Sequence, residues 1–280
     1  MSYIDLYMQS ELISQGNKEP IIYIFGIPFD STTSYKPGTR FGPSAIRQAF
    51  KNIEYNSLNN GINISNATIK DLGNLKFTVN PQYMLDMARK VSNEVINKGF
   101  TGILGGEHLI TLGTYMACKN SSLVILDAHY DLRDEYNDTK YSHATFLRRI
   151  VEERGSDNIL HIGARGFGDD ELEFLKSSKI VSINSKRVHE NPEVIKDYLT
   201  TFNEIYLSID LDAIDPAFAP GVGTPEPLGL TIKQFFDILA ILQERKIKAF
   251  DIVELSPPYD NGSTSVLAAK IILEMIASRL

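Results

Sequence analysis

The sequence predicts an α/β fold in which a mainly parallel sheet is flanked by helices on both faces. Short apolar segments alternate with longer segments of helical periodicity along the whole chain. Strand-helix alternation favours parallel pairing, because each crossover must return over a face of the sheet. A closed eightfold barrel would give a similar pattern, so that alternative stays open. Strands are expected at residues 21–27, 67–73, 101–106, 122–128, 158–164, 179–184, 204–210 and 249–255.

The segments between these strands have the features of helices. Pro43 and Pro192 fall in the first turns of two of them, where a missing backbone N–H breaks no hydrogen bond. No low-complexity linker, internal repeat or change of composition divides the chain, so residues 1–280 are expected to form a single domain. Helices are expected at residues 42–50, 81–99, 144–155, 169–178, 191–200, 231–246 and 264–280.

The composition narrows the possible functions. Hydrophobic residues make up 43% and charged residues 22% of the 280 residues, the balance of an ordinary globular protein. The formal net charge of −7, without a basic cluster, argues against nucleic acid or a membrane surface as the main partner. A single cysteine, Cys118, excludes an intrachain disulfide. Because neither a signal peptide nor a transmembrane segment is recognisable, a cytoplasmic location is expected.

Ionisable side chains follow three of the predicted strands. Ligands gather at the carboxyl ends of parallel strands, where the connecting loops open. Side chains alternate between faces in an extended segment, so that acids and imidazoles two residues apart share one side. Several such groups at a buried strand end would repel one another unless a cation neutralised them. The residues concerned are His108 after GILGGE, Asp127, His129 and Asp131 in DAHYD, and Asp210 and Asp212 in SIDLD.

Each of these motifs alone has a structural explanation, since an isolated Asp-x-Asp is more often a turn or a cap. Together, four carboxylates and two imidazoles match the ligand complement of two divalent cations. Without a thiolate the set favours a fairly hard ion such as Mn²⁺, although Zn²⁺, Fe²⁺ or Co²⁺ could also bind. Two ions about 3.5–4 Å apart would bridge a water molecule and hold it as hydroxide, which predicts metal-assisted hydrolysis.

Four motifs in the chain resemble the ureohydrolase family, which comprises arginases, agmatinases, guanidinobutyrases and formiminoglutamases. They are GGEH, DAHYD, SIDLDAIDPAFAPGVGTPEPLGL and GIPFDSTTSYKPGTRFGPSAIR, within a resemblance that spans residues 26 to 260. The resemblance implies a three-layer α/β/α fold with an eight-stranded parallel sheet and two Mn²⁺ ions held by the six residues above. It is strongest to agmatinases, which split agmatine into putrescine and urea, and it implies a homotrimer or homohexamer.

The resemblance also assigns catalytic roles. Glu254, before SPPYD, matches the family's guanidinium-binding glutamate and could accept two parallel N–H bonds; a capping or salt-bridging carboxylate is the structural alternative. His143 in YSHATF matches a histidine that transfers protons to the leaving amine, which calls for a pKa near neutrality. A helix-capping or surface histidine is the alternative, and Ala144 stands where many relatives have glycine. Asp131 is expected to stabilise developing charge as well as to bind metal.

The expected substrate is a small cationic guanidino compound. Arginases have an asparagine two positions after DAHYD that holds the α-carboxylate, and this chain has Arg133 there. Arg133 could bind the carboxylate of guanidinobutyrate or formiminoglutamate, or it could pair with Asp134 or Glu135. Segment 132–142 holds three acidic and two basic residues, a net charge of −1, which favours the amine of agmatine or aminopropylagmatine over an acid. Arginine and the guanidino acids remain alternatives.

Several further polar residues are expected to be structural. His161 lies within a predicted strand and His189 before a predicted helix. Asp30 and Arg40 could border the pocket or form a structural ion pair. Asp215 precedes a proline and is expected to form a turn that braces the neighbouring ligands.

Two other classes of protein remain open. A non-catalytic paralogue would use the same fold as a binding or oligomer partner, although the complete ligand set argues against it. A deacetylase of similar fold would bind a single metal ion. The glycine-rich segments 163–168 and 221–223 lack the strand, spacing and helix of a nucleotide-binding loop and are expected to be turns.

Overall fold

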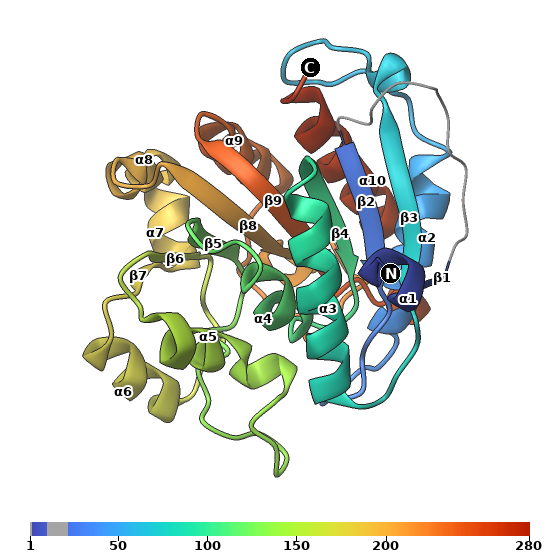
Figure 1. The fold of residues 1–280 in the computed structure, drawn as a ribbon. Helices are drawn as coiled ribbons and strands as arrows, with labels where there is room; N and C mark the ends of the chain where they lie inside the picture. Colours follow the sequence, from blue (N-terminus) through green and yellow to red (C-terminus); the bar gives the residue numbers. More distant parts are fainter. Residues whose placement is uncertain (1, 10–21) are drawn as a thin grey trace.

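One sheet contains every strand in residues 2–9 and 22–280, which the computed structural model describes. Its order is β1-β3-β2-β4-β9-β8-β5-β6-β7, with β2 to β9 parallel and β1 antiparallel to β3 at one edge (Figure 1). The eight predicted strands are therefore confirmed, and the open order excludes the barrel. The strands are β1 (Met8–Gln9), β2 (Ile22–Ile27), β3 (Ile69–Leu75), β4 (Phe100–Gly105), β5 (Ser122–Leu126), β6 (Ile159–Ile162), β7 (Val181–Ile183), β8 (Glu204–Asp210) and β9 (Lys246–Val253).

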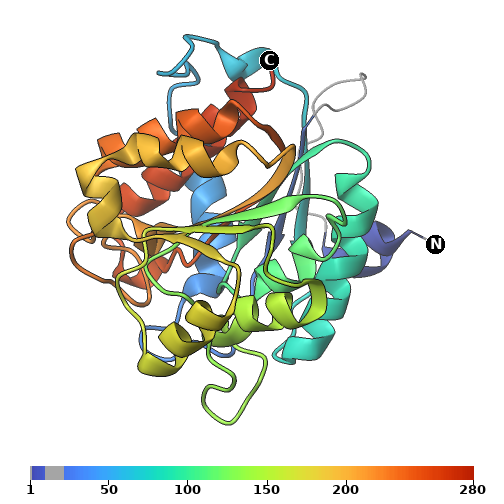
Figure 2. The ribbon, with the colours of Figure 1, turned by 90° about the vertical axis from the view of Figure 1, so that its left-hand side faces the viewer.

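Helices cover both faces of the sheet and complete the three predicted layers (Figure 2). One face packs against α1 (Tyr3–Tyr7), α3 (Pro81–Ile96), α4 (Ile110–Tyr115), α5 (Phe146–Arg154) and α6 (Asp169–Ser177). The other packs against α2 (Gly42–Phe50), α7 (Ser185–Glu190), α8 (Ile195–Leu199), α9 (Ile232–Gln243) and α10 (Ser263–Ala277). Short 3₁₀ helices are η1 (Thr39–Phe41), η2 (Ile64–Asn66), η3 (His143–Thr145), η4 (Pro192–Val194), η5 (Leu211–Ala213) and η6 (Pro257–Tyr259).

Each central strand contributes to two separate apolar cores. In β2, Ile22 and Ile24 pack on the α10 side, whereas Tyr23 and Phe25 pack on the α3 side. All six residues of β2 are buried, as expected of a parallel strand covered on both faces. Burial of each large apolar side chain stabilises the fold by roughly 1.5–3 kcal/mol.

Some elements differ from the sequence-based expectation. The short helix α4 was not predicted, because all six of its residues are buried and an amphipathic period is absent. His189 precedes the predicted helix of segment 191–200, which forms η4 followed by α8, but it also lies inside α7, a helix that was not predicted. Residue 21, the first of a predicted strand, lies outside the described residues. The division into a single domain stays a prediction. Within the described ranges, no helix has the length and apolar character needed to cross a bilayer.

The strand order brings distant parts of the sequence to one edge of the sheet. The chain passes from β4 to β5 across the positions that β8 and β9 later fill. As a result β4, β9, β8 and β5 are neighbours, and their carboxyl ends lie side by side, with Leu126 opposite Ile209 and Asp210 opposite Val253. Such a crossover point is where open parallel sheets bind ligands.

A glycine at the end of β4 lets two loops approach closely. The Gly106 N–H donates to the Ile27 carbonyl at 2.9 Å, and the Glu107 N–H donates to the Phe29 carbonyl at 2.7 Å. A Cβ atom on Gly106 would lie 2.0 Å from the Phe29 carbonyl oxygen, which is main chain and cannot rotate away. Only glycine therefore allows the loop after β2 to pack against the end of β4.

Gly106→Ala is expected to lower the free energy of unfolding by about 1–3 kcal/mol, because the added methyl group pushes two backbone segments apart. Urea unfolding followed by circular dichroism would measure the change. Asn59→Ala, at an exposed loop position, is the control and should leave the midpoint unchanged. An unchanged midpoint for Gly106→Ala would show that the two loops can separate freely.

Candidate metal centre

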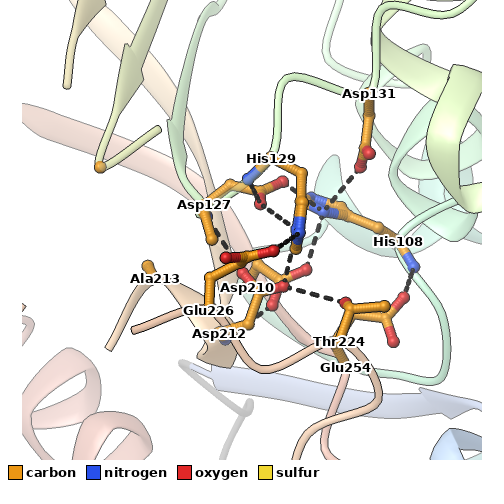
Figure 3. A network of polar contacts seen from close by, with 12 residues as sticks. His108, Asp127, His129, Asp131, Asp210, Asp212, Ala213, Thr224, Glu226 and Glu254 are labelled. Carbon is orange, nitrogen blue, oxygen red and sulfur yellow. Dashed lines mark hydrogen bonds and ion pairs between the residues drawn. The ribbon is translucent and has the colours of Figure 1, made fainter. Parts of the chain in front are cut away.

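Six ionisable side chains meet at the carboxyl ends of β4, β5 and β8 (Figure 3). All are buried except His129, whose side chain is 24% exposed. The structure thus brings together every residue that the sequence marked as a metal ligand, namely His108, Asp127, His129, Asp131, Asp210 and Asp212.

The first group of atoms surrounds Nδ1 of His108. Oδ2 of Asp127 lies 3.0 Å from this nitrogen, Oδ2 of Asp210 lies 3.1 Å from it, and Oδ2 of Asp131 lies 3.7 Å from it. One imidazole nitrogen and three carboxylate oxygens thus converge from three strand ends, which suits a single divalent cation.

The second group surrounds Nδ1 of His129. Oδ2 of Asp212 lies 2.9 Å from this nitrogen, and Oδ1 of Asp127 lies 3.7 Å from it. Asp127 therefore turns one oxygen to each group and joins the two. Two adjacent cation positions that share one carboxylate are the arrangement expected of a binuclear site.

The polar atoms in this cluster lack the partners that burial demands. Among the residues that the structure describes, His108 Nδ1 and Asp127 Oδ2 are buried without a hydrogen bond. Burial, followed by the adjacent Asp127 charge, raises the pKa of Asp131 well above its usual range, and burial with Asp212 does the same to the pKa of Asp210. Divalent cations would use the unpaired atoms as ligands and neutralise these acids, so the residues fit a metal centre.

An outer chain of hydrogen bonds orients His108. Its Nε2 lies 2.9 Å from Oγ of Ser208, and this hydroxyl donates to Asp251 at 2.6 Å. Ser208 must therefore accept from Nε2–H, which leaves the lone pair of Nδ1 directed at the cluster. The role of Asp251 was not predicted, although the one acid within the buried strand β9 is a signal in the sequence.

Two site residues have a left-handed backbone. Asp131 has a φ of 53° and Glu254 a φ of 63°, in a conformation that non-glycine residues rarely adopt. Glu254 is held by its N–H, which donates to the Gly106 carbonyl at 2.9 Å, and by its Oε1, which accepts from the His108 N–H at 2.7 Å. Burial and the neighbouring Glu107 raise the pKa of Glu254 to about 8.

A polar cavity of about 260 Å³ opens over the cluster. Arg133 and Tyr136 line it, as expected of the segment that follows DAHYD. The loops after β6 and β8, whose glycine-rich segments were predicted to be turns, also line the cavity, which their sequence did not indicate. Gly166 has no side chain where a Cβ atom would lie 3.0 Å from the His129 ring, so only a small residue leaves the ring free. The lining residues that were missed are Ser34, Gly166, Phe167, Glu171, Thr224 and Glu226.

His143 lines the same cavity at the start of η3. Its Nε2 lies 3.3 Å from Oγ of Ser34, and its ring packs edge-on against Tyr136. Burial, with the nearby His129 charge, lowers the pKa of His143 to about 4, so the imidazole is neutral at pH 7 rather than poised near its titration point. Ala144 is buried within η3, and its carbonyl accepts from the Arg133 N–H at 3.2 Å.

Arg133 has different partners from those considered. Its guanidinium lies 3.5 Å from Asp170 and 3.5 Å from Glu171, both from the start of α6. The suggested pairing with Asp134 or Glu135 is wrong, because Asp134 forms its 2.7 Å ion pair with Arg149. The reason is that α6 packs beside the loop of Arg133, a long-range contact that sequence spacing does not reveal.

The remaining polar residues are structural. Asp30 forms an ion pair with Arg40 and also accepts from the Gly38 N–H at 3.0 Å. His161 Nε2 lies 2.6 Å from the His129 carbonyl and so helps to hold that loop. Asp215 accepts from the Ala217 N–H in its own turn and from the N–H of Gly229, 14 residues further on; in the described part of the chain it makes no hydrogen bond to the Asp210 or Asp212 side chains.

The chain is similar to proteins of known sequence and structure. A family profile described as the arginase family matches residues 21–277. An agmatinase from Pyrococcus horikoshii is 36% identical over 271 residues, which cover 95% of this chain and 94% of that protein. An N(1)-aminopropylagmatine ureohydrolase from Thermococcus kodakarensis is 36% identical over 91% of this chain and 89% of its own. The crystal structure of agmatine ureohydrolase of Thermoplasma volcanium has a TM-score of 0.90 and 39% identity, over 95% of this chain and 92% of that one.

Asp127→Asn is expected to reduce the bound divalent metal from about two ions per chain to less than one, because Asp127 supplies an oxygen to both groups. Asp212→Asn should retain about one ion, since Asp212 contacts only the group around His129. Elemental analysis after dialysis would give both values. Asp215→Asn is the control and should keep the full complement. Equal metal content in the Asp127 and Asp212 variants would contradict the bridging assignment.

Proposed function

Because the chain belongs to the arginase family, we propose that it hydrolyses the C–N bond of agmatine to release putrescine and urea. The observation that carries the proposal is the convergence of six ligand-type side chains beneath a pocket that also contains Glu254 and His143. Agmatinase relatives that match nearly the whole chain support the choice of agmatine.

We propose Mn²⁺ as the metal, with two ions per chain. His108, Asp131 and Asp210 would hold one ion, and His129 and Asp212 the other, with Asp127 between them. Oxygen-rich ligands with two imidazoles and no thiolate suit this ion. When bound, the ions would lower the pKa of a water molecule and so supply a nucleophile at neutral pH.

Glu254 would hold the guanidinium group of the substrate. Its Oε1 accepts from the His108 N–H and keeps a second lone pair, so Oε1 and Oε2 together can accept two N–H bonds from a guanidinium ion. The carboxyl is buried, so an ionised Glu254 is stabilised by a cation brought next to it. A guanidinium ion stays protonated in water and donates parallel N–H bonds to a carboxylate, which would orient its central carbon over the cluster.

His143 would carry a proton to the leaving amine. The imidazole is neutral in the free chain and faces the pocket, so it can accept a proton from the reacting water and pass it on. Asp131 lies between the ligand group and the pocket, where its charge would also stabilise positive charge that develops on the substrate.

The charges around the pocket favour a cationic tail. Arg133 is opposed by Asp170 and Glu171, whereas Glu226 has no Lys or Arg partner within the described ranges. Its side chain is 39% exposed and lines the cavity. Its charged neighbour in the described chain is His129, whose Nε2 lies 3.8 Å from Oε1. An ammonium group would give Glu226 a permanently charged partner, which suits agmatine and equally an agmatine that carries an aminopropyl group. A homotrimeric or homohexameric assembly and a cytoplasmic location stay predictions.

Urea release from agmatine, arginine and 4-guanidinobutyrate, each supplied separately to Mn²⁺-loaded protein, is the direct test. Agmatine should give the highest kcat/KM, because each of the two other substrates has a carboxylate in its tail that the negative charge of Glu226 would repel. Aminopropylagmatine as a fourth substrate would show whether the tail can be longer. Preference for guanidinobutyrate would assign Arg133 to carboxylate binding, and absence of urea from all four would contradict the proposed reaction.

Glu226→Gln is expected to raise the KM for agmatine about two- to fivefold, the effect of losing one partly exposed ion pair. The KM for butylguanidine, which has no amine, should stay the same, and so should the metal content. An equal rise in KM for both substrates would show that Glu226 acts through His129 rather than through the amine of the substrate. Asp170→Asn, outside the cavity lining, is the control for a general change in charge.

A further inference from the structure

Glu107 precedes the ligand-type residue His108 in the sequence but is not among the ligand-type side chains that converge in the cluster. It is fully buried, and its carboxylate accepts hydrogen bonds from Thr32 and Thr33 in the loop after β2. The Thr32 N–H donates to Oε2 at 2.9 Å, and the Thr32 hydroxyl donates to Oε1. The hydroxyl of Thr33 is a weaker third donor at 3.4 Å. A buried carboxylate thus clamps both donors of Thr32.

Thr32 in turn holds the start of η3. The His143 N–H donates to the Thr32 hydroxyl oxygen at 3.1 Å. The first N–H groups of any helix lack a partner within the helix and need one from outside. Ser142 and Thr145 form a capping box with each other, which leaves the His143 N–H to an acceptor outside this helix. A residue 111 positions away in the sequence therefore caps this helix.

The same loop also reaches the His143 ring, because Ser34 lies 3.3 Å from Nε2. The main chain and the ring of His143 are therefore both located by residues 32–34. The hydrogen bonds run in one direction, from His143 N–H to the Thr32 hydroxyl to Glu107, so that each donor polarises the next. We call the hydrogen-bonded residues Glu107, Thr32 and His143 the clamp. It links the end of β4, which carries the ligand-type residue His108, to the residue that would transfer the proton.

We propose that Glu107 and Thr32 are positioning residues that set the distance between His143 and the leaving amine. This inference rests on the proposed function, because it assumes that His143 transfers a proton during agmatine hydrolysis. Neither residue lines the cavity, and neither is among the ligand atoms of the cluster. Loss of the clamp should therefore affect the proton transfer and leave substrate binding and metal content in place.

Thr32→Val tests the proposal, because it keeps the shape of the side chain and removes the hydroxyl. It should lower the kcat for agmatine about tenfold or more, since a displacement of 1 Å can cost a hundredfold in rate. The KM and the Mn²⁺ stoichiometry should stay within twofold of wild type. Added imidazole, a diffusible proton carrier, should restore part of the lost rate, which a general structural defect would not allow.

Thr33→Val is the matched control, since it removes a neighbouring hydroxyl that does not contact His143. Thr32→Ser should recover most of the rate, because it restores the donor and acceptor. Hydrogen exchange of the His143 amide should be faster in Thr32→Val than in Thr33→Val. An unchanged kcat in Thr32→Val, or loss of metal together with activity, would overturn the inference while wild-type urea release still upheld the proposed function. Failure of the wild type to release urea would count against both.

Discussion

Mutual repulsion among buried carboxylates governs the organisation of the site. Four aspartates lie within reach of two imidazole nitrogens at one edge of the sheet, almost out of contact with water. Such a cluster opposes folding unless positive charge enters it. The surrounding structure therefore has to hold the acids together while the cation position stays open. The backbone strain at Asp131 and the hydrogen-bonded chain behind His108 both serve that end.

Different parts of the chain form the ligand cluster and the cavity above it. Residues at the strand ends meet the cations, whereas loops from four separate regions supply the pocket wall. Glu254 belongs to both, because Oε1 fixes the His108 backbone while Oε2 makes no hydrogen bond to the described residues and its side chain lines the cavity. Loops that carry function are usually anchored to a rigid scaffold, and here Arg165 anchors one of them by donating to the Glu226 carbonyl.

The sequence was sufficient for the eight parallel strands and the six ligand-type residues, because apolar runs and the acids that follow them are local signals. The closed barrel could be excluded only by the observed strand order. Asp251, Glu107 and the partner of Arg133 were not predictable in role, since each depends on contacts between segments far apart in the chain. The roles of His143 and Glu254 came from family resemblance, and the geometry is compatible with them without testing them.

The position of β9 has a consequence for how the protein is made. It is the last strand in the sequence, yet it lies in the middle of the sheet between β4 and β8. Before it is synthesised, the nascent chain can form only two half-sheets, each with an unpaired edge, and His108 belongs to one half while the other five ligand-type residues belong to the other. Pairing these halves late requires contacts between distant parts of the sequence, which form slowly. Until then the unpaired backbone groups of β4 and β8 are exposed and can pair with other chains. Tight metal binding would therefore be possible only after β9 has paired with both β4 and β8. A divalent ion present at that stage would favour the correct pairing of the two half-sheets.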